Sequence, residues 1–118
     1  MILIEPRLKI SLWVSALIRR AQSAGAFAVV MNKGDPDSGA ALINVRSGDG
    51  RHRLYTPAQG MDGSRIWLVS EAEDESIIAA KLAKRLARDT DLWVVEIEDK
   101  GGRHFLTEPI ETLKPREN

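Results

Sequence analysis

The chain has 118 residues, of which 43% are hydrophobic and 29% charged, a size and composition that fit one folded domain over residues 1–118 and exclude a disordered chain. Its 17 basic residues balance its 17 acidic residues, so no surplus of positive charge favours a nucleic-acid partner. Cysteine is absent, which excludes disulfides, thiol nucleophiles and zinc sites that need thiolates.

The N-terminal residues 1–4 are apolar, but Glu5 and Pro6 interrupt the run before it reaches the length of a signal peptide. No stretch of the sequence approaches the ~18–20 apolar residues that cross a bilayer. We therefore expect a cytoplasmic protein that makes no contact with a membrane.

The first half of the chain predicts a helix followed by four strands. Apolar residues recur at helical spacing over 10–24, and Gly25 suits the left-handed position that ends many helices. Beyond Gly25 the period changes to two, which is typical of β-strands. Turn-forming residues separate the expected strands, which span 26–32, 40–46, 51–56 and 65–70. We expect the first two strands to pair as a hairpin with a long loop.

The second half predicts a helix and two more strands. Acidic residues open the segment 71–88 and basic residues close it, which is the order that the helix macrodipole favours. Residues 92–98 alternate between one face expected to be wet and one expected to be packed, the packed face holding Trp93, Val95 and Ile97. Residues 103–107 are expected to pair back on this strand, and the polar tail 108–118 is expected to fray.

The resulting order, α-β-β-β-β-α-β-β, predicts an α+β fold, because the strands come in hairpins and the helices are not regularly interleaved with them. We expect a mainly antiparallel sheet of about five to six strands with two helices. Both helices are expected to cover the same face of this sheet.

The loop 33–39 carries Asp35 and Asp37, two carboxylates that are weak candidates for holding a metal ion. The calcium-loop pattern fails here, because its sixth and twelfth positions hold Ala40 and Arg46 instead of glycine and glutamate. We favour a turn in which both aspartates bond to backbone amides. Nothing in the sequence indicates a cofactor.

Two short stretches resemble each other, because Gly50-Arg51-His52 and Gly102-Arg103-His104 each open an expected returning strand. If the two hairpins meet, their arginines and histidines would bind an anion and transfer protons near neutral pH. The alternative, which we favour, is that the glycines serve two separate turns.

Arg51, Arg53 and Tyr55 alternate onto one strand face, and basic residues beside an aromatic ring can hold a phosphate and stack a base. Together with Arg19 and Arg20, they are candidates for binding nucleic acid or a phosphorylated small molecule. The zero net charge favours an ordinary solvated face instead.

Three tryptophans are many for a chain of this length. Trp93 fits the core pattern, whereas Trp13 lies off the main helix stripe and Trp67 lies opposite its apolar neighbours along the strand. One of these two is a candidate anchor at a protein interface, where tryptophan is enriched. The alternative is that both faces of the sheet are partly covered.

Three segments, LWVSALIRR at 12–20, KGDPDSGA at 33–40 and DLWVVEIED at 91–99, together resemble the bacterial family called domain of unknown function 1491 (DUF1491). The resemblance covers nearly the whole chain and implies a single small domain. It implies no activity, substrate or catalytic residue, because none is established for the family.

The sequence contains no phosphate-binding loop, nucleophile elbow or metalloprotease motif. It therefore favours a non-enzyme over an enzyme built on the two histidines and the aspartates of loop 33–39. The favoured function is a small non-catalytic interaction module that binds a protein partner or a second copy of itself. The alternative is the binding of nucleic acid or a phosphorylated small molecule through the face formed by Arg51, Arg53 and Tyr55.

Overall fold

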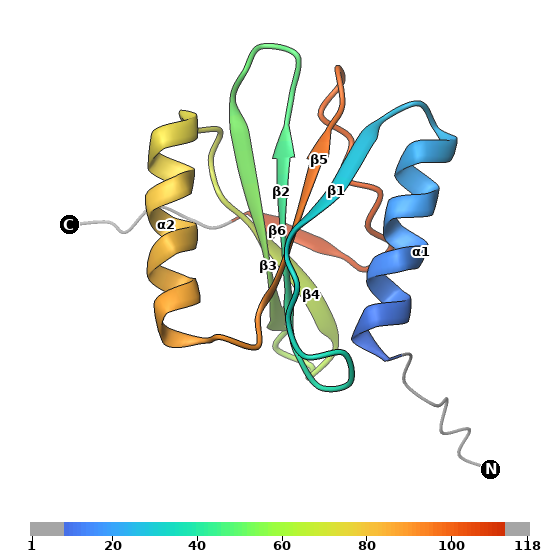
Figure 1. Ribbon diagram of the computed structural model, residues 1–118, viewed down its shortest axis with the longest axis vertical. Helices are drawn as coiled ribbons and strands as arrows, with labels where there is room; N and C mark the ends of the chain where they lie inside the picture. The colour runs from blue at the N-terminus through green and yellow to red at the C-terminus, as the bar shows by residue number, and fades with distance from the viewer. Residues whose placement is uncertain (1–8, 113–118) are drawn as a thin grey trace.

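The structure is a computed structural model, and it describes residues 9–112 (Figure 1). Neither of its helices is long and apolar enough to cross a membrane within that range. The elements follow the predicted order α-β-β-β-β-α-β-β and confirm the α+β fold. They are α1 (Ile10–Ser23), β1 (Phe27–Asn32), β2 (Ala41–Arg46), β3 (His52–Gln59), β4 (Arg65–Val69), α2 (Glu75–Arg88), β5 (Trp93–Glu98) and β6 (Ile110–Thr112).

All six strands form one sheet in the order β1-β5-β2-β3-β4-β6. The pairs β1/β5, β2/β3 and β3/β4 are antiparallel, whereas β2/β5 and β4/β6 are parallel, so the sheet is mixed. The predicted hairpin between the first two strands is wrong, because β5 enters between β1 and β2. The cause is burial on both faces of β5, which makes an interior position in the sheet favourable.

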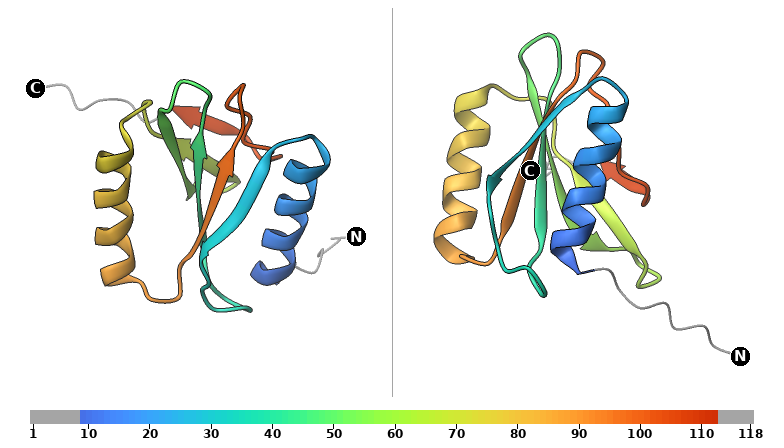
Figure 2. Two further views of the ribbon diagram at one scale, coloured as in Figure 1. Left: turned by 45° about the horizontal axis from the view of Figure 1, so that its top comes forward. Right: turned by 45° about the vertical axis from the view of Figure 1, so that its right-hand side comes forward.

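The two helices lie on opposite faces of the sheet, and the expectation that both cover one face is wrong (Figure 1, Figure 2). Along β2, Leu42 faces the cluster under α2, while the next residue, Ile43, faces the cluster under α1. In β5, Val94 likewise faces the cluster under α2, and Val95 faces the cluster under α1. Because neighbouring residues on both strands are apolar, each face of the sheet needs its own helix to exclude water.

The helix α2 begins at Glu75 rather than at residue 71. The segment before it is held as an extended strap, because His52 and Glu73 exchange two backbone hydrogen bonds of 2.8 Å each. The helix follows Asp74, whose backbone is extended. Pairing with β3 therefore outweighs the helical preference of the acidic residues that precede α2.

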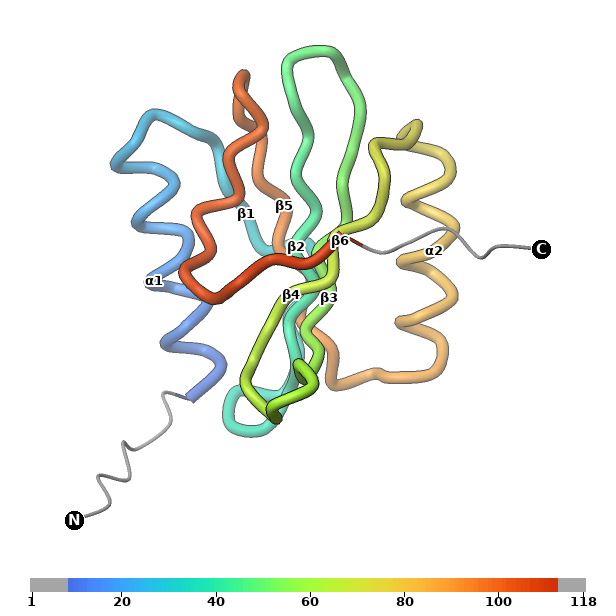
Figure 3. The backbone as a smooth tube through the Cα atoms, turned by 180° about the vertical axis from the view of Figure 1, so that it is seen from behind, coloured from blue at the N-terminus to red at the C-terminus, as the bar shows by residue number. Residues whose placement is uncertain are grey.

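The predicted strand 103–107 does not form. Its central residue, Phe105, has φ of 62°, a left-handed conformation that no strand contains. The chain instead runs past α1 to the far edge of the sheet, where β6 pairs with β4 (Figure 3). Residues 110–112 of the expected frayed tail thus form a strand, and residues 113–118 lie outside the described part of the chain.

The loop between β1 and β2 is fastened to the start of β5. The Asp35 N–H donates to the carbonyl oxygen of Asp91 at 3.0 Å, and the indole N–H of Trp93 donates to the Asp35 carbonyl oxygen at 2.7 Å. Gly34 lies so close to this contact that a β-carbon there would overlap the Asp91 carbonyl group. The loop therefore needs glycine at residue 34 for space.

We predict that Gly34→Ala destabilises the protein by ~1–3 kcal/mol, because the added methyl group must displace the backbone at Asp91. Urea unfolding followed by tryptophan fluorescence measures this loss. Gly101→Ala is the matched control, since a β-carbon there meets only an ordinary contact at 3.6 Å. Equal stability of the two variants would contradict the steric explanation.

Candidate functional site

The two Gly-Arg-His stretches lie side by side at one end of the sheet. Because β2 and β5 are parallel neighbours, the turns that follow them meet. The Gly48 N–H donates to the Lys100 carbonyl oxygen at 3.1 Å, which joins the two turns. Gly50 and Gly102 both have positive φ, so each turn uses glycine for the conformation that side chains disfavour.

The two histidines nevertheless point to opposite faces of the sheet and do not converge. His52 is only 1% exposed, and its Nδ1 lies 3.0 Å from the Asn44 side-chain oxygen on the α2 side. His104 is half-buried on the α1 side, where its ring centre lies 5.1 Å from that of Tyr55. Because the two rings lie on opposite faces of the sheet, they do not form a shared site for proton transfer. Gly102 turns the chain and does not open a paired strand.

The polar contacts around His52 form a chain of three side chains. Asn44 donates through its Nδ2 to a carboxylate oxygen of Glu96 at 3.4 Å, which leaves its oxygen to face His52. The Nδ1 of His52 then carries the proton and donates to Asn44. The other ring nitrogen, Nε2, is buried without a hydrogen-bond partner among the described residues.

The predicted basic and aromatic strand face does not expose its aromatic side chain. Tyr55 is only 5% exposed and packs in the core under α1, and this burial raises the pKa of its hydroxyl. His104 lies against it, and burial lowers the pKa of His104. Arg51 and Arg53 are exposed. Tyr55 is therefore not available to stack a base, although both arginines remain on the surface.

Arg103 fastens the turn after β5. Its guanidinium donates to Asp99, with the shortest contact at 2.8 Å from Nη2 to Oδ1, and also to the Ala24 carbonyl oxygen at 3.1 Å. These side-chain bonds from Arg103, with its backbone N–H, lower the pKa of the Asp99 carboxyl to about 2. Arg103 also lies over the Phe105 ring, 5.0 Å from its centre. Its bonds thus serve to join β5 to the end of α1.

Asp35 and Asp37 have partners within their own loop and at the start of α1. One carboxylate oxygen of Asp35 accepts the backbone N–H groups of Asp37 at 2.8 Å and Ser38 at 2.9 Å, which lower the pKa of Asp35, the Ser38 bond most strongly. Asp37 lies 3.5 Å from the Lys9 amine. Residues 9–112 contain no group of three side chains placed to hold a metal ion.

Trp13 and Trp67 stack on each other, with ring centres 5.6 Å apart. Trp67 is 6% exposed, and its indole N–H donates to the Glu108 carboxylate at 3.0 Å. Trp13 and the segment after Phe105 cover Trp67, so of the two predicted anchors only the half-buried Trp13 retains exposed surface. This packing agrees with the alternative, that both faces of the sheet are partly covered.

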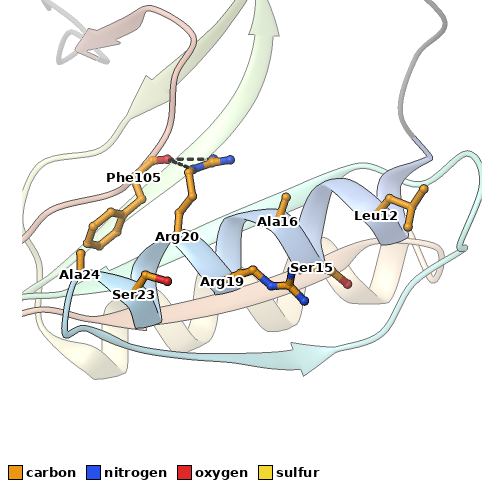
Figure 4. A pocket seen from close by; sticks show the side chains of 8 residues that line it. All are labelled: Leu12, Ser15, Ala16, Arg19, Arg20, Ser23, Ala24 and Phe105. Carbon is orange, nitrogen blue, oxygen red and sulfur yellow. Dashed lines mark hydrogen bonds between the residues drawn. The ribbon is translucent and has the colours of Figure 1, made fainter.

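An open groove of about 880 Å³ lies along the outer side of α1 (Figure 4). Its lining runs from Leu12 to Ala24 on the helix, and the Phe105 ring closes one end. Arg20 donates two hydrogen bonds, at 2.9 and 3.3 Å, to the Phe105 carbonyl oxygen. Sequence patterns did not reveal this groove, because it depends on the left-handed backbone at Phe105.

The edge strand β1 exposes two large apolar side chains. Phe27 is 59% exposed and Met31 is 61% exposed, on the face that also carries Val29. The period of two placed these three residues on one face but did not show that this face is uncovered. The reason is that the alternate residues Ala28 and Val30 are apolar as well, and they are the ones that pack under α1.

The fold and these surfaces define a small α+β domain with a six-stranded mixed sheet between two helices. The family model described as "Protein of unknown function (DUF1491)" matches residues 8–107, and the chain belongs to this family. β6 lies beyond the matched range. No curated protein matches the chain.

Solved structures share the fold over most of the chain. A crystal structure of a DUF1491 family protein from Caulobacter crescentus CB15 is 46% identical, with a TM-score of 0.84, and the match covers 89% of this chain and all (100%) of that one. An NMR structure of a DUF1491 family protein from the same organism is 45% identical, with a TM-score of 0.81 over 91% and 99% of the chains. The solution structure of Atu0922 from A. tumefaciens is 38% identical, with a TM-score of 0.74 over 90% and 98%.

We predict that Phe105→Gly is more stable than Phe105→Ala by about 1 kcal/mol, because glycine adopts positive φ without the steric cost that a β-carbon brings. Both variants lose the same ring, so their difference isolates the backbone. Chemical unfolding of the pair measures it. Thr107 is the control, because it is an exposed loop residue without positive φ. There the alanine variant is expected to be at least as stable as the glycine variant. The same order at both positions would contradict strain at Phe105.

We predict that Asp99 supports the fold at neutral pH and loses this role in acid. Its pKa falls from 3.8 to about 2 on folding, so the stabilisation is complete above pH ~4 and disappears as the pH falls through about 2. Asp99→Asn should therefore melt at a lower temperature than the wild type at pH 7, and the gap should close in acid. Thermal unfolding across pH tests this, with Asp91→Asn as an exposed control. A gap that is independent of pH would show that the ion pair is not the cause.

Proposed function

We propose that this domain is a non-catalytic protein-interaction module that self-associates through the free edge of β1. The observation that carries the proposal is the open edge itself. Within residues 9–112, β1 is an end strand of the sheet and pairs only with β5 (Figure 1). An unpaired edge offers a row of backbone N–H and C=O groups that a further strand can bind.

The side chains of β1 favour such pairing. The strand Phe27–Asn32 contains no charged residue and no proline, which are the features that most often protect a sheet edge. An irregularity in its pairing between Val30 and Asn32 is its one protective feature. The exposed rings and chains of Phe27 and Met31 add apolar area beside the edge, which an added strand would remove from water.

A second copy of the chain fits this edge because β1 carries no charge that would repel it. Lys33 follows one end of β1, and Glu98 on β5 lies opposite Phe27 at the other end. A two-fold axis through the middle of an antiparallel β1–β1 pair brings the Lys33 end of each copy toward the Glu98 end of the other. Glu98 is already paired with Arg46 at 3.6 Å and lies one strand inside the edge, so the fit rests on β1 itself, which carries no charge and introduces no repulsion.

A non-catalytic role is supported by how the candidate polar residues are used. Asp35 holds a turn, Asp99 and Arg103 hold each other, and Tyr55 and His104 pack together. Each of these five side chains is engaged by a neighbour in the fold. A single strand pair also buries little area compared with the ~1,200–2,000 Å² of stable interfaces, so the dimer should be weak and reversible.

We predict that the wild-type protein dimerises reversibly and that Phe27→Lys with Met31→Lys weakens the dimer about tenfold or more, because like charges then face each other across the edge. Sedimentation velocity over a range of protein concentrations measures both constants. Met61→Lys is the control, since Met61 is an exposed loop residue away from β1.

Salt gives a second readout of the same interface. High salt should leave the wild-type dimer intact, because β1 carries no charge and the contact buries the apolar side chains of Phe27 and Met31. A wild-type protein that stays monomeric at millimolar concentration would refute the proposal. A dimer that the double variant leaves intact would do the same.

A further inference from the structure

We propose that the groove between α1 and Phe105 binds an acidic amphipathic helix of a partner protein. This site goes beyond the proposed self-association, because it uses the outer side of α1 and not the edge of β1. Its lining residues on α1 recur at spacings of three and four, from Leu12 to Ala24. They form one continuous stripe opposite the buried stripe of Val14, Leu17 and Ala21.

The length and shape of the groove suit a helix. The twelve-residue advance from residue 12 to residue 24 corresponds to ~18 Å along the helix axis, or about three turns. Small side chains line the groove on either side of Arg19 and Arg20, which occupy its middle; they are Ser15, Ala16, Ser23 and Ala24. On either side of the arginines, small residues leave room for the side chains of a partner helix at an interaxial distance of ~8–10 Å. Apolar anchors at intervals of three and four are how helices bind such grooves.

Apolar groups mark the two ends of the groove. Leu12 is exposed at the start of α1, and the half-buried ring of Phe105 lies beside Ala24 (Figure 4). A partner helix with an apolar stripe would cover both. The occupant must therefore be amphipathic rather than uniformly charged.

The charge of α1 specifies an acidic partner. The helix carries Arg19 and Arg20 and contains no aspartate or glutamate, while the Lys9 amine before it lies 3.5 Å from Asp37. Arg20 is bound to the Phe105 carbonyl oxygen, whereas Arg19 is exposed and makes no side-chain hydrogen bond or ion pair with residues 9–112. Arg19 is thus placed to meet a carboxylate on the partner, and a fork-shaped guanidinium is suited to bind one in two places.

The wall of the groove is set before a partner arrives. Two hydrogen bonds from Arg20 hold the carbonyl group of Phe105, and the guanidinium of Arg103 lies over its ring. These contacts fix the left-handed backbone of Phe105. A wall that does not have to be ordered on binding lowers the entropy cost of forming the complex. Strained backbone held by its surroundings also tends to occur at binding sites.

Nucleic acid is the less suitable occupant. Phosphate binding depends on several free cations along one track, whereas this groove has a single unengaged arginine between small and apolar residues. The apolar ends would also remain uncovered by a phosphate backbone. A labelled RNA oligonucleotide therefore serves as a competing probe in the test.

The test uses two labelled synthetic peptides of about 14 residues, ~21 Å long as helices. One carries leucine and alanine on one face and glutamate on its flanks, and the other replaces every glutamate with lysine. We expect the glutamate peptide to bind the full chain with micromolar affinity that weakens with salt, and the lysine peptide to bind at least about tenfold more weakly. Fluorescence anisotropy gives the constants, and NMR shifts of backbone amides locate the peptide.

Matched variants separate the groove from general charge. Arg19→Glu should weaken the glutamate peptide about tenfold or more, whereas Arg88→Glu makes the same charge change on α2, on the other face of the sheet, and should leave binding unchanged. Ala16→Trp should block the groove by filling it. Phe27→Lys with Met31→Lys should not alter peptide binding, which keeps this result separate from the fate of the β1 dimer.

Four outcomes would overturn the proposal. They are absence of binding by the glutamate peptide, equal effects of Arg19→Glu and Arg88→Glu, amide shifts that lie outside residues 12–24 and 103–106, and RNA binding in this groove by an otherwise peptide-free protein. Circular dichroism of each variant confirms that it is folded. Arg19 and Arg88 are both exposed, so their replacement leaves the core intact.

Discussion

The parallel pairing of β2 with β5 is the contact on which the rest of the structure depends. It runs over six residue pairs, from Ala41 opposite Trp93 to Arg46 opposite Glu98. Its side chains are buried on both faces, so each face requires a helix. Parallel neighbours cannot be joined by a tight turn. The chain therefore places β3, β4 and α2 between them, and this connection brings α2 to the face opposite α1.

The same pairing determines the surfaces. Because β2 and β5 run in one direction, the turns after them meet, and Gly48 bonds to Lys100. The turn after β5 then comes close to the end of α1, where Arg103 reaches the carbonyl group of Ala24. Phe105 follows directly, held by Arg20. The groove is thus a consequence of which strands are neighbours, and a change in sheet order would remove it.

The spacing of apolar residues was sufficient to predict both helices and the first five strands to within a few residues. Each spacing indicates which side of an element is buried. It could not predict partners, because pairing between β1 and β5 joins residues about 70 positions apart and leaves no local signal. One signal was present but misread. The run Ala41 to Val45 contains four apolar residues around Asn44, which indicates burial on both faces.

The errors at the candidate site have a related cause. Residues 103–107 look like a strand, but the bonds of Arg103 to Asp99 and Ala24, and of Arg20 to Phe105, bend the chain away. Those bonds connect residues that are adjacent only after β5 is in place. The sequence favoured two separate turns for His52 and His104, whereas the turns meet, and the alternation of side chains along β3 directs His52 to the α2 face. The sequence identified the candidate residues but not the face of the sheet on which each one lies.

The two proposed surfaces lie on consecutive elements, and their geometry allows both to be occupied at once. The groove is on the outer stripe of α1, whereas the inner stripe packs against the core beneath β1 and β5. The free edge of β1 lies in the plane of the sheet, so a strand added there extends the sheet without covering the outer side of the helix. A dimer would then present two grooves related by a two-fold axis. A partner with two acidic helices would bind such a dimer more tightly than a monomer, because its second helix binds at a raised effective concentration.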